Sequence, residues 1–179
     1  MKIWTLMYDQ SYESTIYKSN DYYEFFFKNF RGDFIQNYDE NIEIETSFKG
    51  EKAERGEKCD ILSMGVKPIL LPKAKDALYD VIKDDVQFIK LKHDKYGECY
   101  MLNVIKVLDC LDESKIRYTN TFSIKKYVFK ENINYPSIFK ITTDGNVGNF
   151  VTEPFMECVE KNKLKGLACD LIWDSERDI

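Results

Sequence analysis

The sequence predicts an α+β fold, a largely antiparallel sheet or meander with a few amphipathic helices packed against it. Three observations lead to this prediction. Residues 41–46 alternate apolar and acidic side chains, as a strand with one solvated face does. Apolar residues recur every three or four positions across residues 73–83, which is the pattern of an amphipathic helix. Residues 86–92 and 98–108 are apolar runs joined by a polar loop with a glycine, which is typical of a β-hairpin.

The N-terminal part begins with a predicted strand at residues 3–8. Residues 12–20 carry polar and turn-forming side chains, so we expect a connection there. Aromatic residues in 21–30 follow helical spacing, although aromatic residues themselves favour strands. We predict a helix in this block, ended by a plain turn at residues 31–33.

Two segments before the central helix are predicted to lack helical structure. Residues 49–58 have mixed charges and two glycines, which indicates a solvated loop. A partner-binding loop is the alternative for this segment. Residues 67–72 form an apolar run that contains two prolines, so we expect an extended segment at the edge of a sheet.

The rest of the chain is predicted to add strands and one more helix. Two strands at residues 116–121 and 122–129 would complete an antiparallel meander with helices on one side. In the last quarter we expect a strand at 136–141 and, after a turn at 143–146, a second strand at 147–151. The predicted features of the following helix and the closing strand are a Thr152 cap, Pro154 in the first turn, inward-facing Phe155, Val159 and Cys158, a stop at Gly166, and a strand at 171–175.

Length and composition indicate one domain over residues 1–179, of which residues 1–60 form the N-terminal part. Aromatic residues make up 15% of the chain, and they either fill the core or form a contact surface. The sequence has no apolar run of membrane-spanning length and no signal-peptide pattern, so we expect a cytoplasmic protein without a membrane partner.

The net charge of −5 argues against nucleic acid as a partner, because binding phosphates needs an excess of Lys and Arg. An acidic surface would favour a basic protein partner, although modest acidity is also common among cytosolic proteins. The five cysteines are Cys59, Cys99, Cys110, Cys158 and Cys169. They form no close pair, which indicates a reducing compartment and no zinc site, and we expect the last three to be small buried apolar side chains.

The usual signatures of catalysis are missing from the sequence. Its eight glycines form no phosphate-binding loop. The single histidine, His93, is expected to be exposed in a hairpin loop, and its alternative role is a general base oriented by Asp94. We therefore expect no catalytic, cofactor-binding or metal-binding residues and no cofactor. Pairs of acids such as Asp84 with Asp85, or Asp109 with Asp112, are expected in solvated turns and helix ends.

The order of short motifs in the second half of the chain carries a family resemblance. A strand ending at residues 138–140 (IFK) is followed by a turn, an acidic helix, and residues 162–167 (NKLKGL) and 171–175 (LIWDS). Upstream, Ser63 is followed by a helix that contains Ala74, Leu78 and Val81. Three motifs come after this helix, at residues 85–88 (DVQF), 100–104 (YMLNV) and 109–112 (DCLD).

Over residues 62–175, with residues 1–9 as a further match, the chain resembles family eleven of the bacterial polymorphic-toxin immunity proteins. The resemblance implies a cytoplasmic protein that is not an enzyme and that binds and neutralises a cognate toxin domain. It identifies no toxin-binding residues, and residues 49–58 do not align with the family pattern. Two alternatives stay open: a small carboxylate-dependent hydrolase or transferase, and a homo-oligomeric structural module that associates with itself.

Overall fold

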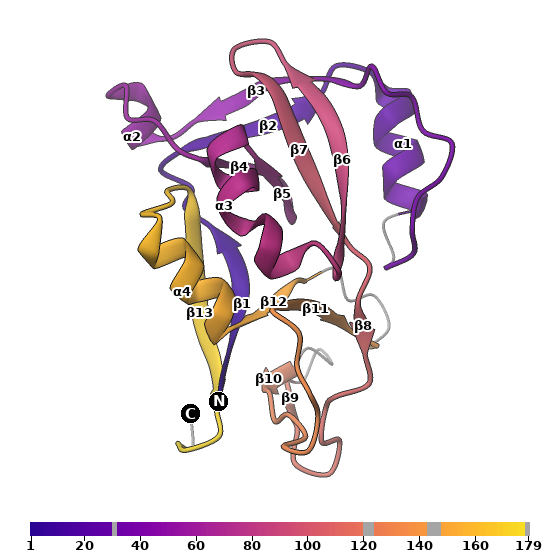
Figure 1. Cartoon of the computed structure of the whole chain (residues 1–179), viewed down its shortest axis with the longest axis vertical. Coiled ribbons are helices and arrows are strands. Elements are labelled where there is room, and N and C mark those ends of the chain that lie inside the picture. The colour runs from indigo at the N-terminus through magenta and orange to yellow at the C-terminus, as the bar shows by residue number, and fades with distance from the viewer. Residues whose placement is uncertain (30–31, 120–123, 143–147, 178–179) are drawn as a thin grey trace.

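The computed structural model describes residues 1–29, 32–119, 124–142 and 148–177 and confirms the predicted α+β class. It also contains a closed β-barrel, which the sequence did not predict. The barrel forms one end of the molecule, and a five-stranded sheet with a small two-stranded hairpin forms the other (Figure 1). The described helices are α1 (Asn20–Asn29), α2 (Glu51–Glu54), α3 (Pro72–Ile82) and α4 (Glu153–Lys161).

The barrel is closed by six strands, and most of its neighbouring strands are antiparallel. The exceptions are the parallel pairs β3 with β6 and β2 with β4, and the second of these closes the ring through Ser14 opposite Ser63. In spatial order the strands are β2 (Glu13–Tyr17), β3 (Glu43–Lys49), β6 (Val86–His93), β7 (Gly97–Val104), β5 (Lys67–Leu70) and β4 (Ile61–Met64).

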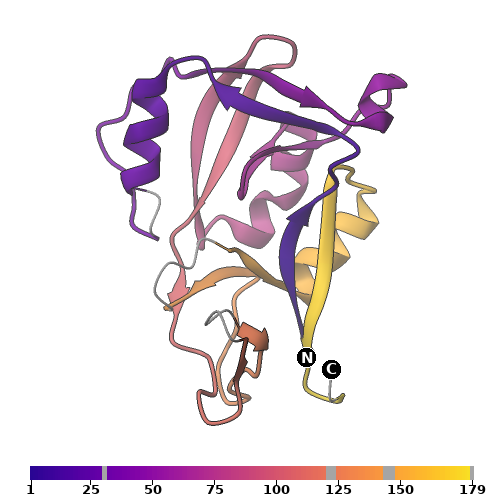
Figure 2. The same ribbon diagram turned by 180° about the vertical axis from the view of Figure 1, so that it is seen from behind.

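The five-stranded sheet joins the two ends of the chain. Its first strand pairs antiparallel with its last, so Met1 and Ser175 lie side by side, as seen from both directions (Figures 1 and 2). In spatial order the strands are β13 (Leu167–Asp174), β1 (Lys2–Tyr8), β12 (Phe150–Thr152), β11 (Ile138–Ile141) and β8 (Val107–Leu108). The separate hairpin consists of β9 (Arg117–Tyr118) and β10 (Ile124–Lys126).

Three groups of buried side chains fill the molecule. One lies inside the barrel, a second lies under α3 and α4, and a third is an aromatic cluster beside the five-stranded sheet. The second group takes Leu6 from the sheet, Leu102 from the barrel and Phe155 from α4. This shared packing supports our proposal that residues 1–179 form one domain.

The prediction of a turn-rich connection at residues 12–20 is wrong, because β2 crosses this segment. The strand reverses the usual polarity of its two faces. Glu13 and Thr15 point into the protein, whereas Ile16 is 47% exposed. A hydropathy pattern detects a strand only when its apolar residues face inward, so this strand was missed.

Two other predictions before the central helix also need correction. Residues 49–58 are not all loop, since α2 forms there, and Gly50 is required because a Cβ at this position would overlap the backbone oxygen of Gln10. The segment at residues 67–72 is not an edge, because β5 lies between β4 and β7. Closure of the barrel gives this strand a second neighbour despite Pro68, which sits opposite Ser63.

The predicted strand at 98–108 is two strands, β7 of the barrel and β8 of the five-stranded sheet, whereas most other elements are confirmed with local differences. Strands and helices form at the predicted blocks 3–8, 21–30, 41–46, 73–83, 86–92, 136–141 and 171–175. Of residues 116–129, only β9 and β10 are strand within the described part, and the predicted turn at 143–146 and residues 120–123 lie outside the described residues. The Thr152 hydroxyl donates to the carbonyl of Pro136 instead of capping α4. The helix ends at Lys161, with Asn162 as its C-cap and a positive φ at Lys163, before Gly166.

The segment after α1 is attached to the barrel by Gln87. Its side-chain amide donates to the Ile35 carbonyl at 2.8 Å, and its oxygen accepts the Ile35 N–H at 2.9 Å. Asn103, opposite Gln87 in the β6–β7 ladder, donates to the Asp33 carbonyl at 2.8 Å. The connection therefore lies against the barrel through backbone hydrogen bonds to two buried amides.

We expect Gln87→Leu to lower the free energy of unfolding by about 2 kcal/mol, because it removes two buried hydrogen bonds from Ile35 without a large change in volume. Urea unfolding would measure the loss, and hydrogen exchange at the Ile35 amide would localise it. Lys90→Gln, on the exposed face of the same strand, serves as the control and should stay within about 0.5 kcal/mol of wild type. Equal stability of the Gln87→Leu variant and wild type would contradict this assignment.

Candidate functional site

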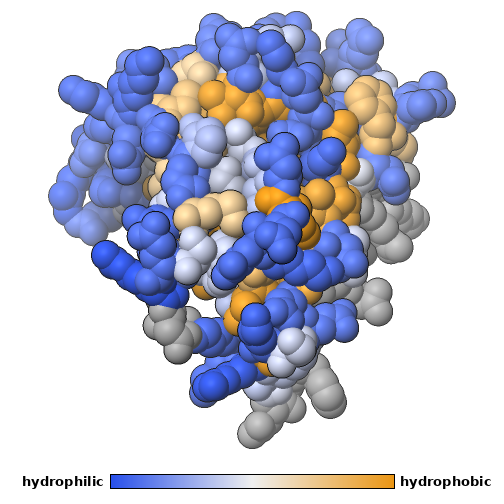
Figure 3. Space-filling view, turned by 60° about the horizontal axis from the view of Figure 1, so that its bottom comes forward, coloured by the Kyte–Doolittle hydropathy of each residue, from blue (hydrophilic) through white to orange (hydrophobic). Residues whose placement is uncertain are grey.

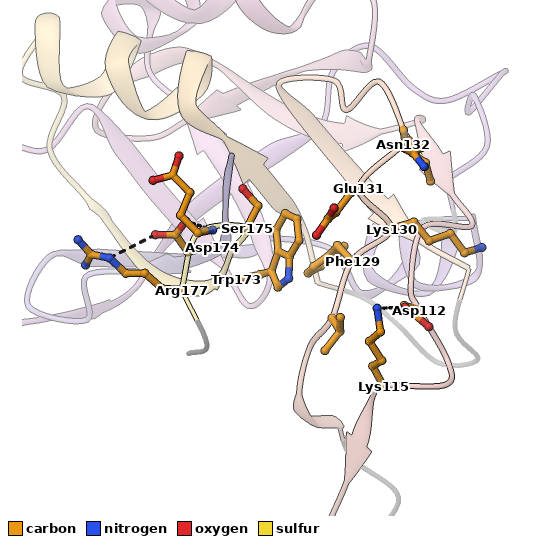
Figure 4. A pocket seen from close by; sticks show the side chains of 13 residues that line it. Asp112, Lys115, Phe129, Lys130, Glu131, Asn132, Trp173, Asp174, Ser175 and Arg177 are labelled. Atoms are coloured by element: carbon orange, nitrogen blue, oxygen red, sulfur yellow. Dashed lines mark hydrogen bonds and ion pairs between the residues drawn. The ribbon is translucent and has the colours of Figure 1, made fainter.

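A hollow of the described surface lies at the end of the five-stranded sheet (Figure 4). It has a volume of about 810 Å³, and Trp173 and Phe129 line it with ring centroids 5.7 Å apart. Charged side chains of both signs surround these rings. They are Asp112, Lys115, Lys130, Glu131, Asp174, Glu176 and Arg177.

The carboxylates of this hollow are held by local partners. Asp174 is 3% exposed and accepts the Glu176 N–H at 3.1 Å. Hydrogen bonds from Ser114 and Lys115 lower the pKa of Asp112, which favours the ionised form. Asp112 and Asp174 lie on opposite sides of the aromatic rings (Figure 4). These two acids therefore do not converge, and Glu131 and Glu176 also line the hollow.

The acid pairs singled out in the sequence have structural partners. Burial raises the pKa of Asp85, and its backbone carbonyl accepts the N–H groups of Ile105 and Lys106. Asp109 accepts a hydrogen bond from Lys130 at 3.2 Å. Asp84 lies exposed in the turn that follows α3. Asp84 and Asp109 are exposed as expected, whereas Asp85 is half-buried and its carbonyl connects the start of β6 to the end of β7.

The expectation that His93 is solvent exposed is wrong, because its side chain is 1% exposed. It is the last residue of β6 and continues the inward-facing series of Ile89 and Leu91, so the ring closes one end of the barrel interior. Its ring centroid lies 4.9 Å from that of Tyr96. Sequence reasoning placed it in the loop because the hairpin strand is one residue longer than predicted.

A buried carboxylate lies in the same part of the barrel. Glu13 is 4% exposed, and it accepts hydrogen bonds from Lys95 Nζ at 2.6 Å and Tyr96 OH at 2.7 Å. Burial alone would raise the pKa of Glu13, but the hydrogen bonds from Lys95 and Tyr96 lower it below the usual value. The group joins β2 to the β6–β7 hairpin and has the partners of a structural ion pair.

The imidazole of His93 makes two contacts that need different protonation states. Its Nδ1 accepts the Lys95 N–H at 3.0 Å and lies 2.8 Å from the Asp94 carboxylate. An unprotonated Nδ1 bonds to Lys95, whereas a protonated Nδ1 would donate to Asp94. Burial lowers the pKa of His93 against the opposing effect of the Asp94 and Glu13 charges, so the neutral form is favoured.

We expect the stability of the protein to fall as the pH drops through and below about 6.5, the ordinary pKa of histidine. The unfolded chain then binds a proton that the folded chain resists, because the folded pKa is the lower one. Urea unfolding at pH 7.5 and 5.5 would measure this, with His93→Phe as the variant that keeps a ring against Tyr96. The contribution of Glu13 appears only at lower pH, so an unchanged pH dependence in the variant would contradict the assignment to His93.

The thiols show no arrangement for metal binding or catalysis in the described residues. No group of three His, Cys, Asp or Glu side chains there could hold a metal ion. All five cysteines are free; Cys110 is buried as expected, whereas Cys158 and Cys169 are only half-buried. Burial raises the pKa of Cys99 and Cys110 to about 12, which makes both thiols poor nucleophiles.

The excess negative charge of the chain is concentrated around α1. Residues 19–46 contain seven acids and two bases, a net charge of −5, and the remaining sequence contains 24 of each. Within this segment, a hollow of about 230 Å³ lies between α1 and the strand-free connection after it. We call it the acidic–aromatic surface; its named residues are Asp21, Tyr22, Phe25, Tyr38, Asp39 and the neighbouring Glu40.

This surface is held in place by aromatic packing. Phe26 is completely buried and stacks on Tyr17 of β2 with ring centroids 5.5 Å apart. Tyr22 donates to Asp39 at 2.6 Å, and the Asn41 N–H donates to the same carboxylate at 2.8 Å. These contacts fix α1 and the connection relative to each other. Sequence reasoning expected Tyr and acidic contacts but named none, and a local charge count would have located this segment.

The face shown in Figure 3 is mostly polar, and its apolar side chains gather in patches interrupted by charged ones. No helix among the described residues is long and apolar enough to cross a membrane.

Comparison with known protein families shows that part of this chain matches a family model. Residues 84–172, about half of the chain, match the model of an immunity protein family (Imm11). The matched segment runs from the start of β6 to near the end of β13, so it includes α4 but neither α1 nor the connection that follows it. No curated protein matches the chain.

Proposed function

We propose that this chain, whose residues 84–172 belong to the immunity protein family (Imm11), binds a toxin protein in the producing cell and neutralises it. The family match is the observation that carries the proposal. A family of immunity proteins implies a toxin partner and a role other than catalysis.

The inhibitor would act by forming a stoichiometric complex in the cytoplasm. The bound chain would block the active site of the toxin or prevent substrate from reaching it. The complex would have to persist for as long as toxin is present. The structure supports this mode of action through a folded scaffold with fixed surface aromatics and ion pairs, which lose little conformational entropy on binding.

Co-expression tests the proposal. On this proposal a large toxin is expected to be encoded beside this chain, and induction of its C-terminal domain alone should stop growth. Induction together with this chain should restore growth, while an unrelated toxin domain should not be neutralised. If the cells die although the chain is present and folded, the proposal is wrong for that pair.

A further inference from the structure

We infer that the acidic–aromatic surface is where the toxin docks, and that it receives a basic patch of the toxin with an apolar side chain at its centre. The inference deepens the proposed function and depends on it. It assigns a binding surface and a partner chemistry to a part of the chain that the family match does not include.

The first argument is the shape and composition of the surface. Half-buried Tyr22, Phe25 and Tyr38 form the walls of a hollow of about 230 Å³, which is large enough for one apolar side chain of a partner. Protein interfaces derive much of their affinity from such aromatic anchors at the centre of the contact, surrounded by polar groups.

The second argument is charge complementarity. Asp21 and Asp39 line the hollow, and Glu40 follows at its rim. Three of the seven acids of residues 19–46 belong to this surface, whereas Glu43 in the same segment pairs with Lys18 and Lys92. The surface acids give the rim a negative charge, which attracts a basic protein. On α3 the exposed acids are neutralised locally, because Asp76 and Asp80 each have a lysine partner on or next to the same helix.

The third argument is preorganisation. The hydrogen bonds of Asp39 with Tyr22 and Asn41 fix one acid of the rim, and Phe26 anchors α1 on the barrel. Gln87 holds the connection against β6. A surface that is already ordered loses little conformational entropy on docking. The hollow at Trp173 lacks this combination, since three bases line it together with four acids.

The test compares two matched pairs of substitutions in binding to the purified toxin domain. Asp21→Lys with Glu40→Lys changes the charge of the proposed surface, and Asp76→Lys with Asp80→Lys makes the same change on α3. We expect the first variant to slow association at low salt by about 10-fold or more, with a smaller effect at high salt, because steering by charge is screened. The α3 variant should associate within about 2-fold of wild type.

A second comparison tests the aromatic contact. Tyr38→Ala, which removes one wall of the hollow, should raise the Kd about 10- to 100-fold, whereas Tyr79→Ala on α3, a tyrosine outside this surface, should change it little. Circular dichroism and thermal unfolding verify that each variant is folded. If wild type binds the toxin and the variants of the acidic–aromatic surface bind equally well, this inference is overturned while the proposed function stands.

Failure of wild type to bind would overturn the proposed function itself. The surface could instead bind a second copy of this chain, and analytical ultracentrifugation of the chain alone tests this by measuring its oligomeric state. A dimer that is dissociated by the substitutions in the acidic–aromatic surface would show that the surface serves self-association, and this result also overturns the inference.

Discussion

Replacing Phe129 with alanine should lower the free energy of unfolding by about 3–5 kcal/mol, the loss typical of a large aromatic side chain removed from a core. Phe129 is 2% exposed and lies at the centre of the aromatic cluster beside the five-stranded sheet. Its ring contacts five other aromatic rings, with centroid distances of 5.7 to 6.3 Å. They belong to Tyr127, Tyr135, Phe139, Phe150 and Trp173.

The size of this effect follows from where the cluster lies. Phe129 comes after the small hairpin, while its partners Phe139, Phe150 and Trp173 come from three strands of the sheet. One side chain therefore connects segments that are far apart in the sequence, and the cavity left by alanine would weaken all of these contacts. Urea unfolding would measure the loss. Tyr118→Ala in the hairpin, where the side chain is 53% exposed, should cost less than about 0.5 kcal/mol, and equal losses for both variants would contradict the role of the cluster.

Replacing Gly166 with alanine should be comparably severe, with a loss of about 4 kcal/mol. The residue has a φ of +109°, which strains any residue with a Cβ, and the new Cβ would overlap the backbone carbonyl of Ile61. Backbone cannot rotate away as a side chain can. The neighbouring Lys165 carbonyl accepts the N–H groups of Asp60 and Ile61, so this clash falls where the barrel meets the five-stranded sheet.

The Gly56→Ala variant separates the two causes of this loss, the positive φ and the overlap with the Ile61 carbonyl. Gly56 also has a positive φ, at +81°, but a Cβ there would meet no atom within 4 Å. Alanine at this position should cost about 1–2 kcal/mol from backbone strain alone. Thermal and urea unfolding of both variants would measure the difference, and a Gly166→Ala variant no less stable than the Gly56→Ala variant would show that the close approach to Ile61 is unimportant.

Much of the fold could be predicted because its elements have regular patterns. The helix at α3 and the hairpin of β6 and β7 bury apolar residues at the expected spacing. The barrel could not be predicted, because its closure depends on the parallel pairing of β2 with β4 and of β3 with β6. Long-range pairing of this kind has no local sequence signal, and β2 carries its polar residues inside.

Buried polar groups explain the errors in individual residues. His93 and Glu13 resemble surface residues by type, but Lys95 and Tyr96 provide partners that make their burial possible. Thr152 has the residue type of a helix cap, yet its hydroxyl bonds to Pro136 on the neighbouring connection. In each case the hydrogen-bond partner is brought into place by the tertiary structure.

The candidate site was predictable in chemistry and not in position. Tyrosines and acids were the expected contact types, and the charge of residues 19–46 is present in the sequence. The hollow between α1 and Tyr38 depends on how Phe26 packs against Tyr17, a contact between separate elements. Which residues become neighbours on the surface therefore depends on this tertiary contact, which the sequence alone does not reveal.

The central claim is that the chain neutralises a toxin by binding it directly. Isothermal titration of the purified chain into the purified toxin domain encoded beside it tests this claim without any cellular readout. We predict a saturable complex of one chain with one toxin domain, formed at a concentration that also abolishes toxin activity in vitro. Two folded proteins that show no binding at micromolar concentrations would contradict the account.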